Sequence, residues 1–269
     1  DMVLGLYYIT KERPGAKGSG LKFYGPEEVI IAFNEKVIDM HAPIEVRLPK
    51  DKQDLTKGYE MVKTTAGRII VNQYMPEEVP YVNEVLGKKS LRTVITNVIK
   101  HTGVTRTAQF LDDIKNLGYD QAFRAGISFN LGDVLIPEEK TALIEEGYTK
   151  VEAIKDNFQM GFITNNERYN KVIDLWTSID NQLTAIVKKQ ISADQQGFNP
   201  VYMMLDSGAR GSTQQIKQLC GMRGLMAKPQ KSGASGAEII ENPIVSNLKE
   251  GMSVLEYFIS THGARKGLI

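Results

Sequence analysis

The stretch "TNNERYNKVIDLWTSIDNQLTAIVKKQI", residues 164–191, decides the fold of this chain. Its apolar residues recur every three or four positions, which predicts a long helix with one apolar face. Thr164 and Glu167 have the spacing of a capping box, which places the start of the helix there. At about 1.5 Å per residue, this helix is roughly 40 Å long. The apolar face consists of Tyr169, Val172, Ile173, Trp176, Ile179, Leu183, Ile186 and Val187.

A second helix of the same kind comes just before it. "EEKTALIEEGYTKVEAIKDNF" (138–158) follows Pro137 and has the same apolar spacing, provided that Gly147 does not end the helix. The pattern stops at "QMGFIT" and then resumes. The two segments therefore predict an antiparallel helical hairpin with its tip near Gly161. The many charges around the stripe favour a protruding hairpin over two helices buried inside a bundle.

The sequence around the hairpin predicts mixed structure. Residues 1 to about 65 read as mainly irregular, with a short helix after Pro26 and a strand at 42–49. The segment 64–76 predicts a turn followed by a strand. Two short helices that each end at a glycine are expected at 90–103 and 105–118, and a last helix is expected from Leu248.

The fold class that follows is α+β and predominantly helical. A mixed α/β N-terminal part is followed by the long antiparallel helical hairpin and then by C-terminal helices. We expect four divisions of the chain, at 1–136, 137–192, 193–236 and 237–269.

The amino-acid composition argues against some classes of protein. The 269 residues include 33 Lys and Arg against 32 Asp and Glu, and this balance argues against an autonomous nucleic-acid-binding protein. Cys220 is the one cysteine, so neither an internal disulfide nor a cysteine zinc site is expected, and a cytoplasmic location fits. No apolar run approaches the roughly 20 residues of a membrane helix. Because the chain begins at Asp1 and stops inside an apparent helix, we expect a piece of a longer protein.

Several short motifs have both a structural and a functional interpretation. "DSGARGST" (206–213) places Arg210 between glycines before a helix, which suits an anion, but a loop with Ser212 as helix cap is favoured on these residues alone. "GMRGLMAK" (221–228) is interpreted as a loop packed by methionine, or as a place where Arg223 reaches a partner. In "STHGARKGL" (260–268), two glycines lie one turn apart in a helix, each at a cost of about 1 kcal/mol.

No catalytic site is recognisable from these residues. His41, His101 and His262 are far apart and form no metal-binding motif, and no G-x-S-x-G elbow is present. We therefore expect no catalytic residue and no metal ligand in this chain.

Six ordered segments resemble one family, the bacterial RNA polymerase β′ subunit. The resemblance spans essentially the whole chain, and the last three segments are long and specific. The segments are "TTAGRII", "RAGISFNLGDVLIPEEK", "ERYNKVIDLW", "YMMLDSGARGS", "QLCGMRGLMAKP" and "EYFISTHGARKGL".

The resemblance implies a part of DNA-directed RNA polymerase, a nucleotidyltransferase. The chain would form the pore region, the rim helices of the secondary channel (138–191), the segment under the active centre (201–228) and the first half of the bridge helix (248–269). Arg210 would contact the triphosphate of the incoming nucleotide, and Arg223 with Met222 would support bridge-helix and trigger-loop movement. Regulators would dock on Tyr169, Asn170, Lys171 and Asp174. The bridge-helix hinge and its charges would be His262, Gly263, Arg265, Lys266 and Gly267.

The resemblance also implies partners and cofactors. The partners would be the β, α, ω and sigma subunits, template DNA, RNA and transcription factors of the secondary channel, with no membrane, in the bacterial nucleoid. Mg²⁺ and Zn²⁺ would belong to the whole enzyme. This chain departs from the full family pattern because the three-aspartate magnesium loop, the zinc-binding cysteines and the trigger loop are absent. "PQKSGASGAEIIENP" (229–243) is also longer than the family pattern, and Ile269 replaces a small residue.

Two other functions remain open on the residues alone. The amphipathic hairpin suits an autonomous coiled-coil module that binds protein partners. A free nucleotide-binding protein that uses Arg210 is the weaker alternative, because one arginine in a loop supplies little affinity without magnesium.

Overall fold

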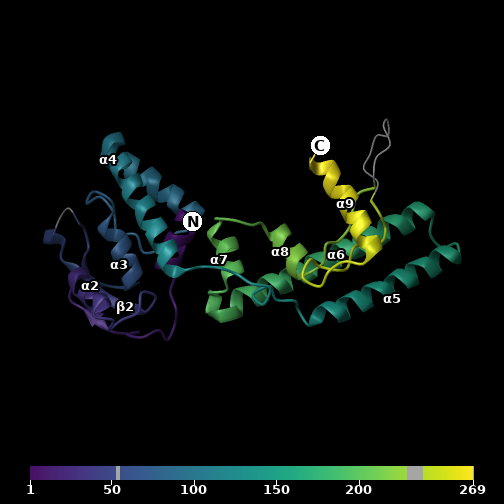
Figure 1. Cartoon of the computed structure of the whole chain (residues 1–269), viewed down its shortest axis with the longest axis horizontal. Coiled ribbons are helices and arrows are strands. Elements are labelled where there is room, and N and C mark those ends of the chain that lie inside the picture. Colours follow the sequence, from purple (N-terminus) through teal and green to yellow (C-terminus); the bar gives the residue numbers. More distant parts are fainter. Residues whose placement is uncertain (53–54, 229–238, 269) are drawn as a thin grey trace. The chain divides into compact units, whose positions relative to one another are not determined.

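A computed structural model describes residues 1–52, 55–228 and 239–268 of the chain (Figure 1). The chain forms two compact units. The first contains Asp1–Ser128 and Tyr202–Arg210, and the second contains Phe129–Val201 and Gly211–Ile269. The predominantly helical α+β fold is confirmed. In the described part of the chain, no helix is both long and apolar enough to cross a membrane.

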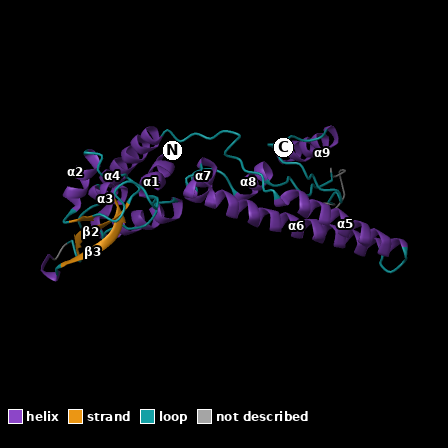
Figure 2. Cartoon of the chain, turned by 90° about the horizontal axis from the view of Figure 1, so that it is seen from below, coloured by secondary structure: helices purple, strands orange, loops and turns teal. Residues whose placement is uncertain are grey.

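A small three-stranded sheet and five helices make up most of the first unit. The strand order is β1–β2–β3, with β1 parallel and β3 antiparallel to β2. Figure 2 shows β2 and β3 side by side. The predicted strand at 42–49 and the helix after Pro26 are confirmed. The elements are α1 (Met2–Thr10), β1 (Lys22–Phe23), α2 (Pro26–Asn34), β2 (Pro43–Pro49), η1 (Leu55–Lys57), β3 (Tyr59–Thr65), α3 (Ala66–Gln73), α4 (Lys88–Ala125) and most of α7 (Pro200–Ser207).

The core of this unit has two parts. Alternate residues of β2 point inward and pack with side chains of α2 and α3 on one face of the sheet. A second cluster fills the space between α1, α3 and α4. The inward residues of β2 are Ile44, Val46 and Leu48.

Two predictions for this unit are wrong. Residues 66–73 form a helix rather than a strand, because Thr65 accepts a hydrogen bond from the Arg68 amide and caps it. Its apolar run reads as a strand because Ile69 and Val71 pack on the two different clusters. Residues 2–10 form a helix instead of irregular chain. Six of its nine residues are buried, so the helix has no polar face that its sequence could reveal.

The prediction of two short helices at 90–103 and 105–118 is correct for the break between them and wrong for the end of the second. The chain does break at Gly103, whose φ of 75° and ψ of 178° are not helical. The second helix does not end at Gly118, however, and continues to Ala125. Gly126 then ends it in the left-handed conformation, with φ of 57°.

The predicted hairpin forms the largest part of the second unit. α5 (Glu139–Gln159) and α6 (Asn165–Ala193) run antiparallel, with their tip near Gly161 as predicted (Figures 1 and 2). The capping box of Thr164 and Glu167 is confirmed, with both of its hydrogen bonds present. The same unit holds η2 (Asp194–Gly197), α8 (Thr213–Cys220) and α9 (Val254–Leu268).

The seam of the hairpin is closed by an aromatic pair. Trp176 is 2% exposed and packs with Val151, Val172 and Ile179. The ring of Tyr148 meets the Trp176 ring edge to face at 5.2 Å between centroids. Gly147 does not end α5. It packs against the side chains of Ile179 and Trp176, and a Cβ atom there would stand 2.6 Å from Ile179 and 3.0 Å from Trp176.

Candidate functional site

α8 leads into the segment that contains two of the predicted functional residues. Ser212 and Gln215 form a capping box at its start, which confirms the predicted cap. At its other end, Cys220 and Met222 are completely buried. Burial raises the pKa of the Cys220 thiol to about 11, so this cysteine is a small core residue as expected.

Residues 222–228, here the Arg223 segment, pair with residues 239–247, here the Ser246 segment. The backbones of Gly224 and Ile244 exchange two hydrogen bonds of 2.9 Å, and Ala227 pairs with Ile239. The amide of Arg223 donates to the carbonyl of Ser246 at 3.2 Å. This short antiparallel pairing fixes the backbone of Arg223 against the chain that leads to α9.

The first turn of α6 holds the far end of the Ser246 segment. The Tyr169 hydroxyl accepts a hydrogen bond from the Ile239 amide at 2.9 Å and donates to the Ile239 carbonyl at 3.0 Å. Arg168 forms two hydrogen bonds with the Glu241 carboxylate, of 2.6 and 2.9 Å. The bonds from Arg168 lower the pKa of Glu241. Tyr169, expected at a docking surface, therefore has its hydroxyl committed within the unit.

A further ion pair joins α8 to α6 beside the Arg223 segment. Lys217 donates to Asp180 at 2.7 Å, and these side chains are only 11% and 19% exposed. Gly224 lies next to both groups and has a φ of 86°, a conformation that favours glycine. The pair and the glycine together fix the course of the loop at this point.

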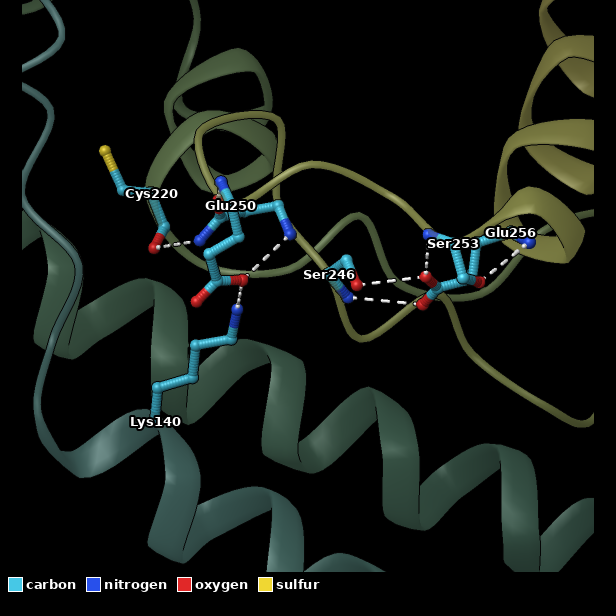
Figure 3. Close-up of polar contacts among 7 residues, drawn as sticks. Lys140, Cys220, Ser246, Glu250, Ser253 and Glu256 are labelled. Atoms are coloured by element: carbon cyan, nitrogen blue, oxygen red, sulfur yellow. Dashed lines mark hydrogen bonds and ion pairs between the residues drawn. The ribbon is translucent and has the colours of Figure 1, made fainter.

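The start of α9 is tied to the Ser246 segment by one carboxylate (Figure 3). Glu256 accepts hydrogen bonds from the Ser253 amide at 2.9 Å and from the Ser246 hydroxyl at 3.0 Å, and its amide donates to the Ser253 hydroxyl at 3.3 Å. The Ser246 amide adds a longer bond of 3.4 Å. Partial burial raises the pKa of Glu256, but these hydrogen bonds outweigh it and hold the pKa below its usual value.

The loop between the Ser246 segment and α9 is anchored to the base of the hairpin. Lys140, which is 5% exposed, forms an ion pair with Glu250 (Figure 3). The Glu250 amide donates to the Asn247 side chain at 2.7 Å, and Asn247 donates to the Cys220 carbonyl at 3.2 Å. The chain that enters α9 is therefore held by α5, α8 and the Ser246 segment together.

Sequence reasoning missed Ser246, Glu250 and Glu256. One signal was available, because "SVLE" (253–256) has the spacing of a capping box and marks the start of a helix. The contacts of Ser246 and Glu250 join residues far apart in the chain, and no local pattern reveals them.

Comparison with known proteins matches this architecture to one family. A model described as RNA polymerase Rpb1, domain 3, matches residues 1–134, and one described as RNA polymerase Rpb1, domain 4, matches residues 163–249. The chain is 65% identical over 268 residues to the DNA-directed RNA polymerase subunit beta′ of Parabacteroides distasonis. It is 64% identical over 269 residues to that of Bacteroides fragilis, and 58% identical over 274 residues to that of Flavobacterium johnsoniae.

The chain belongs to the bacterial RNA polymerase β′ family. All of the chain is covered in these alignments, and it spans 19% of the length of these β′ relatives. The family expected from the sequence is confirmed.

The remaining residues expected from the β′ resemblance lie in several places. Asn170, Lys171 and Asp174 are exposed on α6. Arg210 belongs to the first unit, and its exposed side chain follows α7. His262 is exposed on α9. The backbones of Gly263, Arg265, Lys266 and Gly267 belong to α9, and the side chains of Arg265 and Lys266 lie outside the described part of the structure.

The described residues of this β′ chain do not suit a metal ion. No three His, Cys, Asp or Glu side chains in the described ranges come together as ligands would.

Proposed function

We propose that this chain forms the wall of the secondary channel and the first half of the bridge helix of a DNA-directed RNA polymerase. The observation that carries the proposal is the match to β′ subunits over the whole chain, at 58% to 65% identity. The helical hairpin and the anchored start of α9 support it, because a channel rim and a moving helix both need a firm base. In this role the chain shapes the active centre of the polymerase and supplies no catalytic carboxylate.

Arg210 is the proposed contact for the triphosphate of the incoming nucleotide. It is exposed, so a ligand can reach its guanidinium group, which suits a phosphate oxyanion in geometry and charge. Arg223 and Met222 are the proposed support for bridge-helix and trigger-loop movement. Met222 is buried and the Arg223 amide bonds to the Ser246 carbonyl, which favours support through packing and backbone contacts.

The exposed side chains of Asn170, Lys171 and Asp174 are the proposed docking patch for regulators that enter the channel. The hydroxyl of Tyr169 is bonded to the backbone of Ile239, so Tyr169 would join this patch through its ring rather than through its hydroxyl. The proposed hinge of the bridge helix consists of His262, Gly263, Arg265, Lys266 and Gly267, where two glycines would lower the cost of bending. The proposed partners are the β, α, ω and sigma subunits, template DNA and RNA, with Mg²⁺ and Zn²⁺ held elsewhere in the enzyme.

A chimeric subunit tests the main proposal. The matching part of the Bacteroides fragilis subunit is replaced by this chain, and the chimera is assembled with the other subunits and assayed for primer extension on template DNA. We expect extension by the assembled chimera and none by the isolated chain with Mg²⁺ present. An inactive but fully assembled chimera, or Mg²⁺-dependent synthesis by the chain alone, would contradict the proposal.

Two substitutions test the assigned residues in the same chimera. Arg210→Ala is expected to raise the KM for nucleoside triphosphate, because a phosphate contact is lost. Lys171→Ala is expected to weaken regulator binding and to leave unregulated extension unchanged. Lys188→Ala removes an exposed lysine farther along α6 and serves as the matched control. If the two lysine variants weaken regulator binding equally, the proposed docking patch is contradicted.

An autonomous protein-binding hairpin is the second candidate. It is favoured by the apolar side chains at the hairpin tip, where Met160 is 68% and Phe162 is 74% exposed. Removing both side chains distinguishes the candidates. If binding through the hairpin tip is the main function, every activity of the chain should require these side chains. If the chain is part of the polymerase, primer extension by the chimera should survive the change.

A further inference from the structure

The first turn of α9 has little apolar packing to hold it. Val254, Leu255, Tyr257 and Phe258 are between 54% and 76% exposed. The contacts that fix this turn are polar and converge on Glu256 (Figure 3). Since exposed apolar side chains contribute little to the placement of a helix, the direction of the first turn of α9 depends on these hydrogen bonds.

Ser246 contacts both sides of this junction. Its carbonyl accepts from the Arg223 amide at 3.2 Å, and its hydroxyl donates to Glu256 at 3.0 Å. A displacement of the Arg223 segment therefore reaches the first turn of α9 through one residue. The donors to Glu256 are neutral amide and hydroxyl groups, whose hydrogen bonds depend on direction more than an ion pair does.

We propose that Ser246 and Glu256 are positioning residues, which couple the Arg223 segment to the start of α9 and so set the position of that helix during nucleotide addition. This inference rests on the proposed function. It adds a role for two residues that are separate from the proposed nucleotide contact and from the proposed hinge. Both residues act through α9 and have no contact with the reacting groups.

The chain offers variants that separate this coupling from simple helix capping. Glu256→Ala removes the carboxylate and with it both the link to Ser246 and the cap on Ser253. Ser246→Ala removes only the hydroxyl that donates to Oε2 of Glu256, and the Ser253 amide keeps its bond to the same oxygen. Ser253→Ala does the reverse, because it weakens the cap and leaves Ser246 and Glu256 in place.

The experiment uses the assembled polymerase chimera described above. Hydrogen exchange is measured for the Arg223 amide and for the first turn of α9, together with kcat and KM for primer extension. In Ser246→Ala and Glu256→Ala, we expect exchange at Arg223 to rise by about tenfold, the size expected for losing one hydrogen bond to a charged group. We also expect kcat to fall with KM for nucleoside triphosphate unchanged.

The controls decide between coupling and a local structural effect. Ser253→Ala should speed exchange in α9 and leave the Arg223 amide as it was. Ser246→Thr, which retains a hydroxyl, should restore kcat, and Ser192→Ala removes a serine hydroxyl whose bond stays within α6. Unchanged exchange at Arg223 in Ser246→Ala, or an unchanged kcat of that variant in an active chimera, would overturn the inference. A wild-type chimera without activity would instead overturn the proposed function.

Discussion

Gly5 of α1 and Gly118 of α4 face each other where the two helices cross. A Cβ atom at Gly5 would overlap the carbonyl oxygen of Gly118, so the helix backbones are in direct contact. A Cβ atom at Gly118 would in turn stand 2.7 Å from the carbonyl oxygen of Met2. This crossing explains why Gly118 lies within a helix, since it serves close packing rather than helix termination.

The crossing predicts that Gly5→Ala destabilises the chain by about 3 kcal/mol, since a backbone must move to admit the methyl group. Urea unfolding followed by circular dichroism measures the change. Gly25→Ala is the control, because a Cβ atom at Gly25 would meet nothing within 4 Å. That variant should cost below about 1 kcal/mol. Equal losses in the two variants would mean that the helices do not cross at Gly5.

The hairpin seam predicts a large effect at Trp176. Because the ring is 2% exposed, Trp176→Ala should lower the free energy of unfolding by about 3 to 5 kcal/mol. Phe162→Ala removes an aromatic ring that is 74% exposed at the hairpin tip and should cost below about 0.5 kcal/mol. A loss below about 1 kcal/mol at Trp176 would place its ring on the surface.

The ion pair between Asp180 and Lys217 predicts non-additive substitutions. Lys217→Met should cost about 3 kcal/mol, because it leaves a largely buried carboxylate without its cation. Adding Asp180→Leu should recover part of this loss, which tryptophan fluorescence during urea unfolding can measure. Lys150→Met, which breaks an exposed pair with Glu146, should cost below about 0.5 kcal/mol. Additive losses at 180 and 217 would show that the two groups do not interact.

The pair of Arg168 with Glu241 predicts a pH-dependent contribution to stability. Since the pKa of Glu241 is lowered in the folded chain, its contribution is present above the unfolded pKa of about 4.3 and is lost as the pH falls through the folded value. Glu241→Gln should therefore destabilise the chain at pH 7 and have progressively less effect below about pH 4. Unfolding curves of both proteins across this range measure the difference. A difference that does not depend on pH would contradict the pairing.

Cys220 is expected to resist thiol reagents in the folded chain. It is completely buried and the pKa of its thiol is raised to about 11, so almost no thiolate exists at pH 8. A colorimetric thiol reagent should react with it slowly in buffer and within seconds to minutes in urea. Rapid reaction in buffer would show that the end of α8 opens readily.

Patterns in nearby residues were enough to predict the hairpin, the caps at Thr164 and Ser212, and the break at Gly103. Each depends on spacing within one or two helical turns, where the sequence states the physical constraint directly. The family resemblance likewise followed from ordered segments, because long specific matches do not need a structure.

The sequence by itself therefore determined the long helices, where they begin, and the family of the chain. Only the tertiary structure decided that α3 is a helix, that Gly118 packs against α1, and that Tyr169, Ser246 and Glu256 hold the chain that enters α9. These features depend on contacts between distant segments, such as the bond between Arg223 and Ser246. A local pattern records what a segment prefers alone, whereas burial and distant hydrogen bonds are settled only when the segments meet.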